Sequence, residues 1–178
     1  MQRIIINNHY HLSPITNNDI PALLEYCNDI EIYNNTLLIP YPYLEKDAVA
    51  FLNWMDEKQK EFNIPLVYAI RNDAEQLTGI IGLICKYKSD SHKEEIGYWM
   101  GKPFRGNGIT TSALKTFVDY LFTHTNYIRI EAQTYLHNAA SQKVLQAAGF
   151  EMEGIMKKNF LKKGVYLDTR MYSRIKDL

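Results

Sequence analysis

The segment 105–110 holds the residues whose types and spacing most clearly suit the binding of a ligand. It reads Arg105-Gly106-Asn107-Gly108-Ile109-Thr110 and separates a predicted strand from a predicted helix. The first turn of that helix carries no acidic side chain, so its free backbone N–H groups and the positive end of its dipole favour a pyrophosphate. Gly106 and Gly108 can adopt positive φ and let a ligand approach the main chain, and Arg105 would add charge at the rim.

This loop does not identify its ligand by itself. An ordinary flexible turn into a helix explains an isolated Gly-x-Gly equally well. The segment lacks the Gly-x-x-x-x-Gly-Lys-Ser/Thr pattern of P-loop proteins, and it has no third glycine at the Gly-x-Gly-x-x-Gly position of dinucleotide-binding folds. The sequence therefore favours a different phosphate-bearing ligand.

Other kinds of chemistry find less support. His9 and His11 share one face of a predicted strand, but the sequence pairs no further ligands with them, so we expect no metal. No Gly-x-Ser-x-Gly elbow for a serine nucleophile occurs. Cys27 and Cys85 lie in apolar stretches and supply neither a disulfide framework nor a zinc ligand set, so we expect buried thiols.

The elements that must position these residues follow from the apolar patterns. Runs rich in β-branched and aromatic residues predict about seven strands, at 10–15, 65–71, 77–87, 94–100, 127–134, 150–160 and 165–175. Apolar stripes at helical spacing predict about four helices, around 20–27, 48–55, 113–122 and 138–148, the last of them stopped by Gly149. A long loop at 29–44 separates the first two helices. This order predicts a mixed sheet flanked by helices.

Composition limits the classes of protein that the chain can belong to. Its 178 residues suit a single domain over 1–178, with a core at about 10–176. Twenty basic and twenty acidic side chains give no net charge, which argues against non-specific binding of nucleic acid. The apolar run at 4–6 is far too short for a signal peptide or a membrane span, so we expect a cytoplasmic protein without a membrane partner. The sequence does not distinguish a monomer from a homodimer.

Two spaced blocks resemble the GNAT superfamily of acetyl-CoA-dependent acetyltransferases. Glu95-Ile96-Gly97-Tyr98-Trp99 followed by 105–111 resembles its acetyl-CoA signature, (Gln/Arg)-x-x-Gly-x-(Gly/Ala). Asn138-Ala139-Ala140-Ser141, continued to Ala148-Gly149-Phe150, is similar to the Asn-x-x-Ser…Gly-Phe segment of the RimJ/RimL-type branch. The resemblance covers essentially the whole chain. It implies an α/β (α+β) GNAT fold with a mixed, mostly antiparallel sheet, a cleft where two parallel strands splay apart, and acetyl-CoA as co-substrate.

The chain departs from the family pattern at two positions. Thr110 stands where the signature prefers Gly or Ala, although its backbone N–H could still serve. Leu145 stands where many members have a Tyr that is thought to protonate the departing thiolate, and this points towards the RimJ/RimL-type branch. The same Leu145 keeps open a different class of function, a non-catalytic module that binds acyl-CoA.

The resemblance also implies roles for individual residues. Glu95 matches a position where the superfamily often places the base that deprotonates the amine, whereas Glu94 should point to the other face of its strand. A solvated carboxylate is the alternative for Glu95. A backbone N–H near Trp99 or Met100 would stabilise the developing oxyanion. Ser141 is the candidate to assist the thiolate. The remaining candidates for cofactor contact are Trp99, Met100, the six residues 105–110, Asn138, which also suits a helix N-cap, and Lys143.

The acceptor amine is expected opposite the cofactor, between the loop 29–44 and the last hairpin. Tyr33, Tyr41, Tyr43 and the turn near Lys162 are the candidate acceptor contacts, with simple packing of the tyrosines as the alternative. Polyamines and aminoglycosides would favour a strongly acidic cleft, but the loop region supplies only Asp29, Glu31 and Glu45. This favours the α-amino group of a peptide or protein N-terminus over a small-molecule amine.

Overall fold

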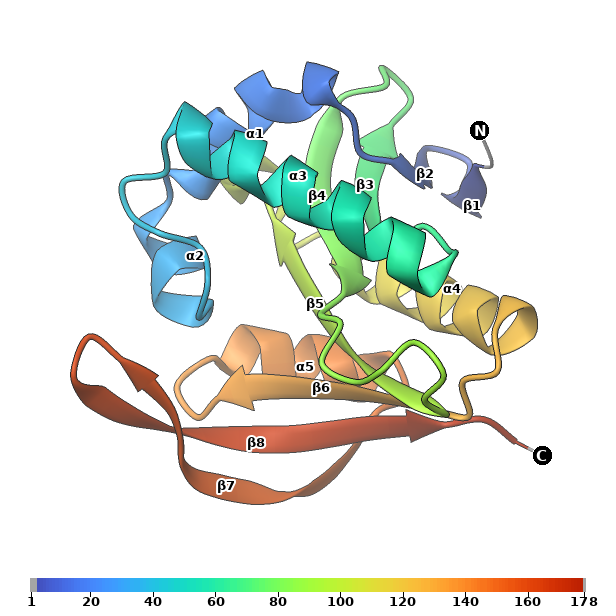
Figure 1. Ribbon diagram of the computed structural model, residues 1–178, viewed down its shortest axis with the longest axis vertical. Helices are drawn as coiled ribbons and strands as arrows, with labels where there is room; N and C mark the ends of the chain where they lie inside the picture. Colours follow the sequence, from blue (N-terminus) through green and yellow to red (C-terminus); the bar gives the residue numbers. More distant parts are fainter. Residues whose placement is uncertain (1–2, 178) are drawn as a thin grey trace.

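A computed structural model describes residues 3–177, and its eight strands form one mixed sheet in the order β1-β2-β3-β4-β5-β6-β8-β7 (Figure 1). Seven strands lie close to the predicted ranges, and the sheet is one strand larger than expected. The strand bounds are β1 (Ile4–Asn7), β2 (Tyr10–Pro14), β3 (Val67–Asn72), β4 (Leu77–Leu83), β5 (Lys93–Met100), β6 (Arg129–Tyr135), β7 (Glu151–Lys162) and β8 (Val165–Ile175).

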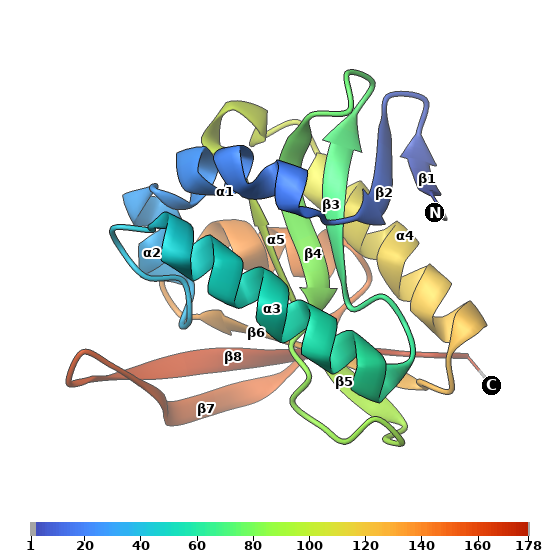
Figure 2. The same ribbon diagram turned by 45° about the horizontal axis from the view of Figure 1, so that its top comes forward.

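Helices cover both faces of the sheet. In Figures 1 and 2, α3 runs across one face together with α1, and α4 and α5 lie on the other. The helix bounds are α1 (Ile20–Cys27), α2 (Ile30–Asn35), α3 (Glu45–Phe62), α4 (Ile109–His124) and α5 (Ala139–Ala147), with short 3-10 turns at Asn17–Asp19 and Lys102–Phe104. None of the helices within residues 3–177 is both long enough and apolar enough to span a membrane.

Three local differences from the sequence prediction have physical causes. The predicted loop 29–44 contains α2, whose start is capped by the Asp29 carboxylate accepting the Glu31 N–H at 2.8 Å. The run 4–6 forms part of β1, which pairs with β2 at the edge of the sheet. The strand predicted at 77–87 ends at Leu83, because Cys85 takes a φ of +57° and leaves the extended conformation.

Among the strands of residues 3–177, the feature that positions the site is the single parallel pairing, between β5 and β6. Every other neighbouring pair of strands is antiparallel. The parallel pairing covers only Lys93–Glu95 against Arg129–Glu131. Beyond Glu95 the two strands diverge, which opens the sheet at its centre, as the GNAT resemblance implies.

Candidate active site

A cavity of about 920 Å³ passes through the gap between β5 and β6. On the face that carries α3 it is lined by residues that include Phe51, Trp54 and Glu95. On the face that carries α4 and α5 its lining includes Thr110 and Ser141. Because one cavity reaches both faces, a ligand held at α4 and a second one held beneath α3 could meet between the splayed strands.

The loop before α4 has the conformation expected for an anion site. Gly106 and Gly108 have φ of +81° and +79°, and a Cβ added at either position would meet no atom within 4 Å. The first turn of α4 carries no acidic side chain. Within residues 3–177, the N–H groups of Thr110 and Thr111 donate no hydrogen bond, while the Ile109 N–H donates to the Asn107 side chain at 3.3 Å. Free amides and open space therefore coincide at the N-terminus of α4.

Arg105 does not supply free charge at this loop, contrary to the sequence prediction. Its guanidinium donates to Glu31 at 2.6 Å and to Asp29 at 2.7 Å, and its Nε donates to the Met100 carbonyl at 2.9 Å. These carboxylates lie at the start of α2, which the sequence did not reveal. Arg105 therefore ties α2 to the end of β5, and the loop must attract an anion through its backbone.

Glu95 lies where the strands part, and its side chain is held in place from two sides. Only 8% of the residue is exposed. Its Oε2 accepts a hydrogen bond from Lys86 Nζ at 2.7 Å and another from Gln133 Nε2 at 3.0 Å. Gln133 in turn accepts from Asn159 and from the Thr169 hydroxyl. This network fixes one carboxylate at the wall of the cavity.

The Glu94 carboxylate accepts hydrogen bonds from backbone N–H groups and is not part of the Glu95 network. It is fully buried, and its carboxylate accepts the N–H groups of Lys86 at 2.8 Å and Tyr87 at 3.4 Å, as well as the N–H of Glu95. Burial raises the pKa of Glu94 above its usual range. By holding the chain after β4, Glu94 places Lys86 beside Glu95. Burial alone would lower the pKa of Lys86, but the hydrogen bond and charge of Glu95 outweigh it and raise that pKa.

A hydroxyl pair spans from β5 to α5. The Tyr98 hydroxyl lies 2.8 Å from Ser141 Oγ. Burial raises the pKa of Tyr98 above its usual range. Asn138 caps α5 as predicted, since its side chain accepts the Ser141 N–H at 3.0 Å. The cap thus also orients the backbone that carries Ser141.

The register of β5 shows which backbone amide faces the gap. The Ile84 N–H donates to the Glu95 carbonyl, and the Gly101 N–H donates to the Thr78 carbonyl. Because strand residues alternate, Trp99 directs its N–H towards β4, whereas Tyr98 and Met100 direct theirs towards the gap. Of the two amides considered for an oxyanion, that of Met100 therefore faces the cavity.

Comparison with known proteins agrees with this arrangement. A family model described as an acetyltransferase (GNAT) domain matches residues 9–151. The chain belongs to this family. A probable N-acetyltransferase, YjcK from Bacillus subtilis (strain 168), is 35% identical to this chain over 115 residues. These make up 65% of the chain and 62% of YjcK, so the chain spans less than two thirds of that relative.

Two further relatives match most of the GNAT chain. The L-amino acid N-acetyltransferase AaaT from Escherichia coli (strain K12) is 26% identical over 160 residues, covering 89% of this chain and 93% of that protein. A solved structure of RimL, a ribosomal-protein α-N-acetyltransferase in complex with coenzyme A, has a TM-score of 0.88 at 20% identity and covers 99% of both chains. At that identity the likeness to RimL shows the fold alone.

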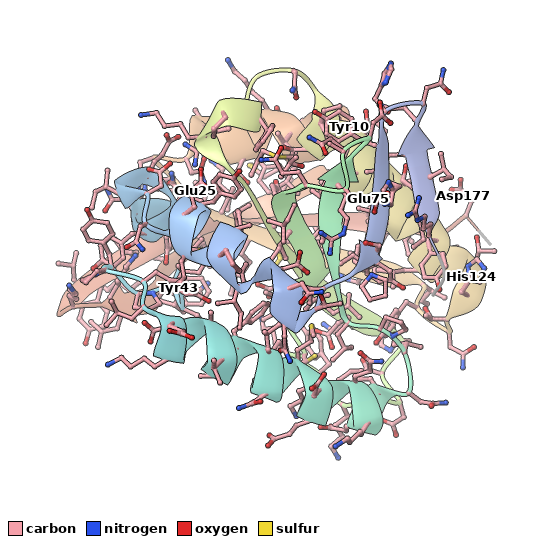
Figure 3. All side chains as sticks on the ribbon, turned by 90° about the horizontal axis from the view of Figure 1, so that it is seen from above. Tyr10, Glu25, Tyr43, Glu75, His124 and Asp177 are labelled. Carbon is pink, nitrogen blue, oxygen red and sulfur yellow. The ribbon has the colours of Figure 1, made fainter. Side chains whose placement is uncertain are left out.

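The three tyrosines that the sequence suggested for the acceptor side lie in different places in the structure. Tyr43, labelled ahead of α3 in Figure 3, lines the cavity but is only 5% exposed. Tyr33 and Tyr41 pack against each other, with ring centroids 5.9 Å apart, outside the cavity lining. Lys162 lies over the Tyr33 ring at 3.9 Å and donates to the Tyr33 and Thr36 carbonyls. The last hairpin therefore docks on α2, and Tyr33 takes part in this packing.

Two further positions singled out in the sequence lie away from the cavity, and Asn107, Gly108 and Ile109 of the α4 loop are also not part of its lining. Lys143 is exposed on α5 and is not part of the cavity lining. Leu145 is fully buried in the core. Neither side chain therefore contributes to the walls of this GNAT site.

Several lining residues were missed at the level of sequence. Lys86 and Gln133 carried no local signal, because only the tertiary fold brings them to Glu95. Phe51 and Trp54 did carry one. The fully buried line of α3 includes Ala48, Leu52 and Met55, whereas Phe51 and Trp54 extend the apolar stripe sideways and remain half-buried. The apolar stripe of α3 is therefore wider than the part that packs against the sheet, and Phe51 and Trp54 make up the extra width.

Proposed function

We propose that this acetyltransferase moves the acetyl group of acetyl-CoA to the α-amino group of a peptide or protein N-terminus. The observation that carries the proposal is the position of Glu95, a fixed carboxylate at the point where the cavity passes from the α4 loop to the space beneath α3. We also propose that residues 10–176 act as one catalytic domain.

The α4 loop fits the pyrophosphate of acetyl-CoA. Gly106 and Gly108 leave open space at the loop, and the amides of Thr110 and Thr111 point from the helix N-terminus without protein partners in the described residues. Trp99, Met100 and Asn138 line the same cavity and are proposed to contact the rest of the co-substrate. We keep Lys143 as a candidate contact only for the outer phosphate.

Amide formation requires protons to move in both directions. The acceptor ammonium loses one proton before attack and a second as nitrogen bonds to the acetyl carbon, while the C–S bond breaks and the sulfur gains a proton. Glu95 is proposed to receive the first proton, directly or through water. The second proton replaces, through water, the proton that the Ser141–Tyr98 pair gives to the sulfur. The Met100 N–H is proposed to stabilise charge on the carbonyl oxygen, and Ser141, with Tyr98 behind it, to donate to the departing sulfur.

The balance of charge in the cavity supports an α-amine over a polycationic acceptor. Glu31 is engaged by Arg105, and Glu95 already faces one cation, Lys86. A polyamine or an aminoglycoside would require several uncompensated carboxylates. RimL, whose structure is similar, is described as acting on a ribosomal protein α-amine, which is the same class of acceptor.

The direct test is mass spectrometry of products formed from acetyl-CoA and a panel of peptides, polyamines and aminoglycosides. We expect a mass increase of one acetyl group at peptide N-termini. Acetylation confined to polyamines or aminoglycosides would establish the small-molecule alternative. Binding of CoA without transfer to any member of the panel would establish a non-catalytic module.

The role of Glu95 has its own test. Glu95→Gln is expected to lower kcat by about tenfold at pH 7, because the amide cannot take up the proton of the ammonium and only about a tenth of an α-amine is unprotonated at that pH. The defect should shrink above about pH 8, where an α-amine loses its proton without help. Glu57→Gln on the exposed side of α3 is the matched control and should retain full activity. A defect of constant size across this pH range would rule out Glu95 as the base.

A further inference from the structure

The part of the cavity beneath α3 has an apolar wall that the transfer chemistry does not need. Phe51 and Trp54 stack along one side of α3, with ring centroids 6.2 Å apart. Ile84, directly after β4, lines the same cavity and leaves 41% of its surface exposed. Leu37 and Ile39, in the segment between α2 and α3, also line it. Large apolar side chains are thus left in contact with solvent beside the proposed base.

Two glycines lie opposite each other on β4 and β5, and neither has a side chain that could project from the sheet into this region. Gly82 pairs with Gly97 in the strand register. A Cβ on Gly82 would come within 2.7 Å of the Leu66 carbonyl oxygen, and a Cβ on Gly97 would come within 2.6 Å of Ile84 Cδ1. A side chain at Gly82 is therefore excluded by backbone atoms, whereas a side chain at Gly97 would displace the tip of Ile84, which lines the cavity.

Three carboxylates line this region, from Glu31, Asp47 and Glu95. Glu31 is paired with Arg105, and Asp47 accepts the Leu44 N–H at the start of α3, which orients its carboxylate without neutralising it. The Glu95–Lys86 pair lies in the same lining as the apolar wall. A ligand that carries an ammonium next to an apolar group matches both properties, because its ammonium can approach Glu95 while its side chain covers the aromatic wall.

We infer that this region selects acceptors whose α-amine is borne by a residue with a large apolar side chain, held against Phe51, Trp54 and Ile84. The inference rests on the proposed transfer to an α-amine and narrows it to a substrate class. Two kinds of acceptor carry an α-amine next to a large apolar side chain. One is a free apolar amino acid, whose carboxylate could approach Lys86, and the other is the first residue of a peptide.

The test compares initial rates for peptides that differ only in their first residue. With a saturating acetyl-CoA concentration, kcat/KM is measured for Phe-, Leu-, Ala- and Ser-initiated tripeptides, free L-phenylalanine and L-phenylalanine amide. We expect the Phe and Leu acceptors to exceed Ala and Ser by at least about tenfold, the order expected for extra methylene and ring groups in an apolar pocket. The free amino acid and the tripeptide together identify which source is used.

Variants of the wall connect this preference to the structure. Trp54→Ala should reduce the Phe-over-Ser ratio towards one mainly by lowering kcat/KM for Phe acceptors, and Gln59→Ala on the exposed side of α3 is the matched control. If Trp54→Ala does not fold, Ile84→Ala, at a partly exposed site, provides the same comparison. Equal rates for Phe- and Ser-initiated acceptors would overturn the inference and leave the proposed function intact, whereas no acetylation of any acceptor would overturn both.

Discussion

The 2.8 Å contact between Tyr98 and Ser141 is the residue-scale feature that bears most directly on the departing sulfur. Ser141→Ala and Tyr98→Phe should each lower kcat by about 100-fold, since each removes part of one proton donor. The double variant should be no slower than the slower single variant, because residues that act as a unit are not additive. Single-turnover acetylation rates measure this cycle, with exposed Ser89→Ala as the control. Independent, multiplying effects would contradict a shared role.

At the residue scale, roles that depend on near neighbours in the chain could be predicted from the sequence. Asn138 could be predicted as a cap because the bond to the Ser141 amide spans three residues. Arg105 could not be placed correctly, because its partners Asp29 and Glu31 are more than 70 residues away in the chain. The roles of Glu95 and Ser141 in catalysis remain predictions, although the fold brings both to the same cavity.

At the scale of elements, the turn into α4 connects backbone conformation to co-substrate binding. Gly108→Val should weaken acetyl-CoA affinity at least about tenfold, because a β-branched residue resists positive φ and its side chain would project into the open space at the loop. Gly164→Val, at φ +80° with equally open surroundings in the β7–β8 turn, imposes similar strain far from α4. Calorimetric titration with acetyl-CoA compares the two variants. Equal affinities would show that the α4 loop does not hold the phosphates.

Elements with strong periodic patterns were predictable, and those that depend on a tertiary partner were not. The stripe along α4 and the glycine after α5 each carry a local signal, and Gly149 does take a φ of +84°. The six-residue α2 has no such stripe and is stabilised by the Asp29 cap and by the Lys162 contact from the last hairpin. The early end of β4 depends on Glu94, which binds the backbone of the next segment from across the hairpin.

At the scale of the whole molecule, the open cleft creates a structural weakness that a charged network offsets. Only three residue pairs join β5 to β6, so few backbone hydrogen bonds connect the two halves of the sheet. Glu131 on β6 accepts from Lys93 on β5 at 3.1 Å, from Arg129 at 2.7 Å and from the Tyr87 hydroxyl at 2.6 Å. Arg129 continues this network to Glu153 on β7. The network therefore links both halves at the point where the strands part.

This network predicts how stability depends on pH. Hydrogen bonds from Arg129 and Ser173 lower the pKa of Glu153 to about 2, and the donors around Glu131 lower its pKa despite burial. A carboxylate whose pKa is lower in the folded state stabilises the fold above its unfolded pKa, near 4.5, and this contribution is lost as pH falls through the folded pKa. Glu131→Gln should therefore cost about 1–3 kcal/mol of unfolding free energy at pH 7 and progressively less from pH 4.5 downwards, where the wild-type carboxylate is also neutralised. Urea unfolding across this range, with Glu57→Gln as the control, measures the difference, and an offset that is independent of pH would show that Glu131 acts through packing and not through its charge.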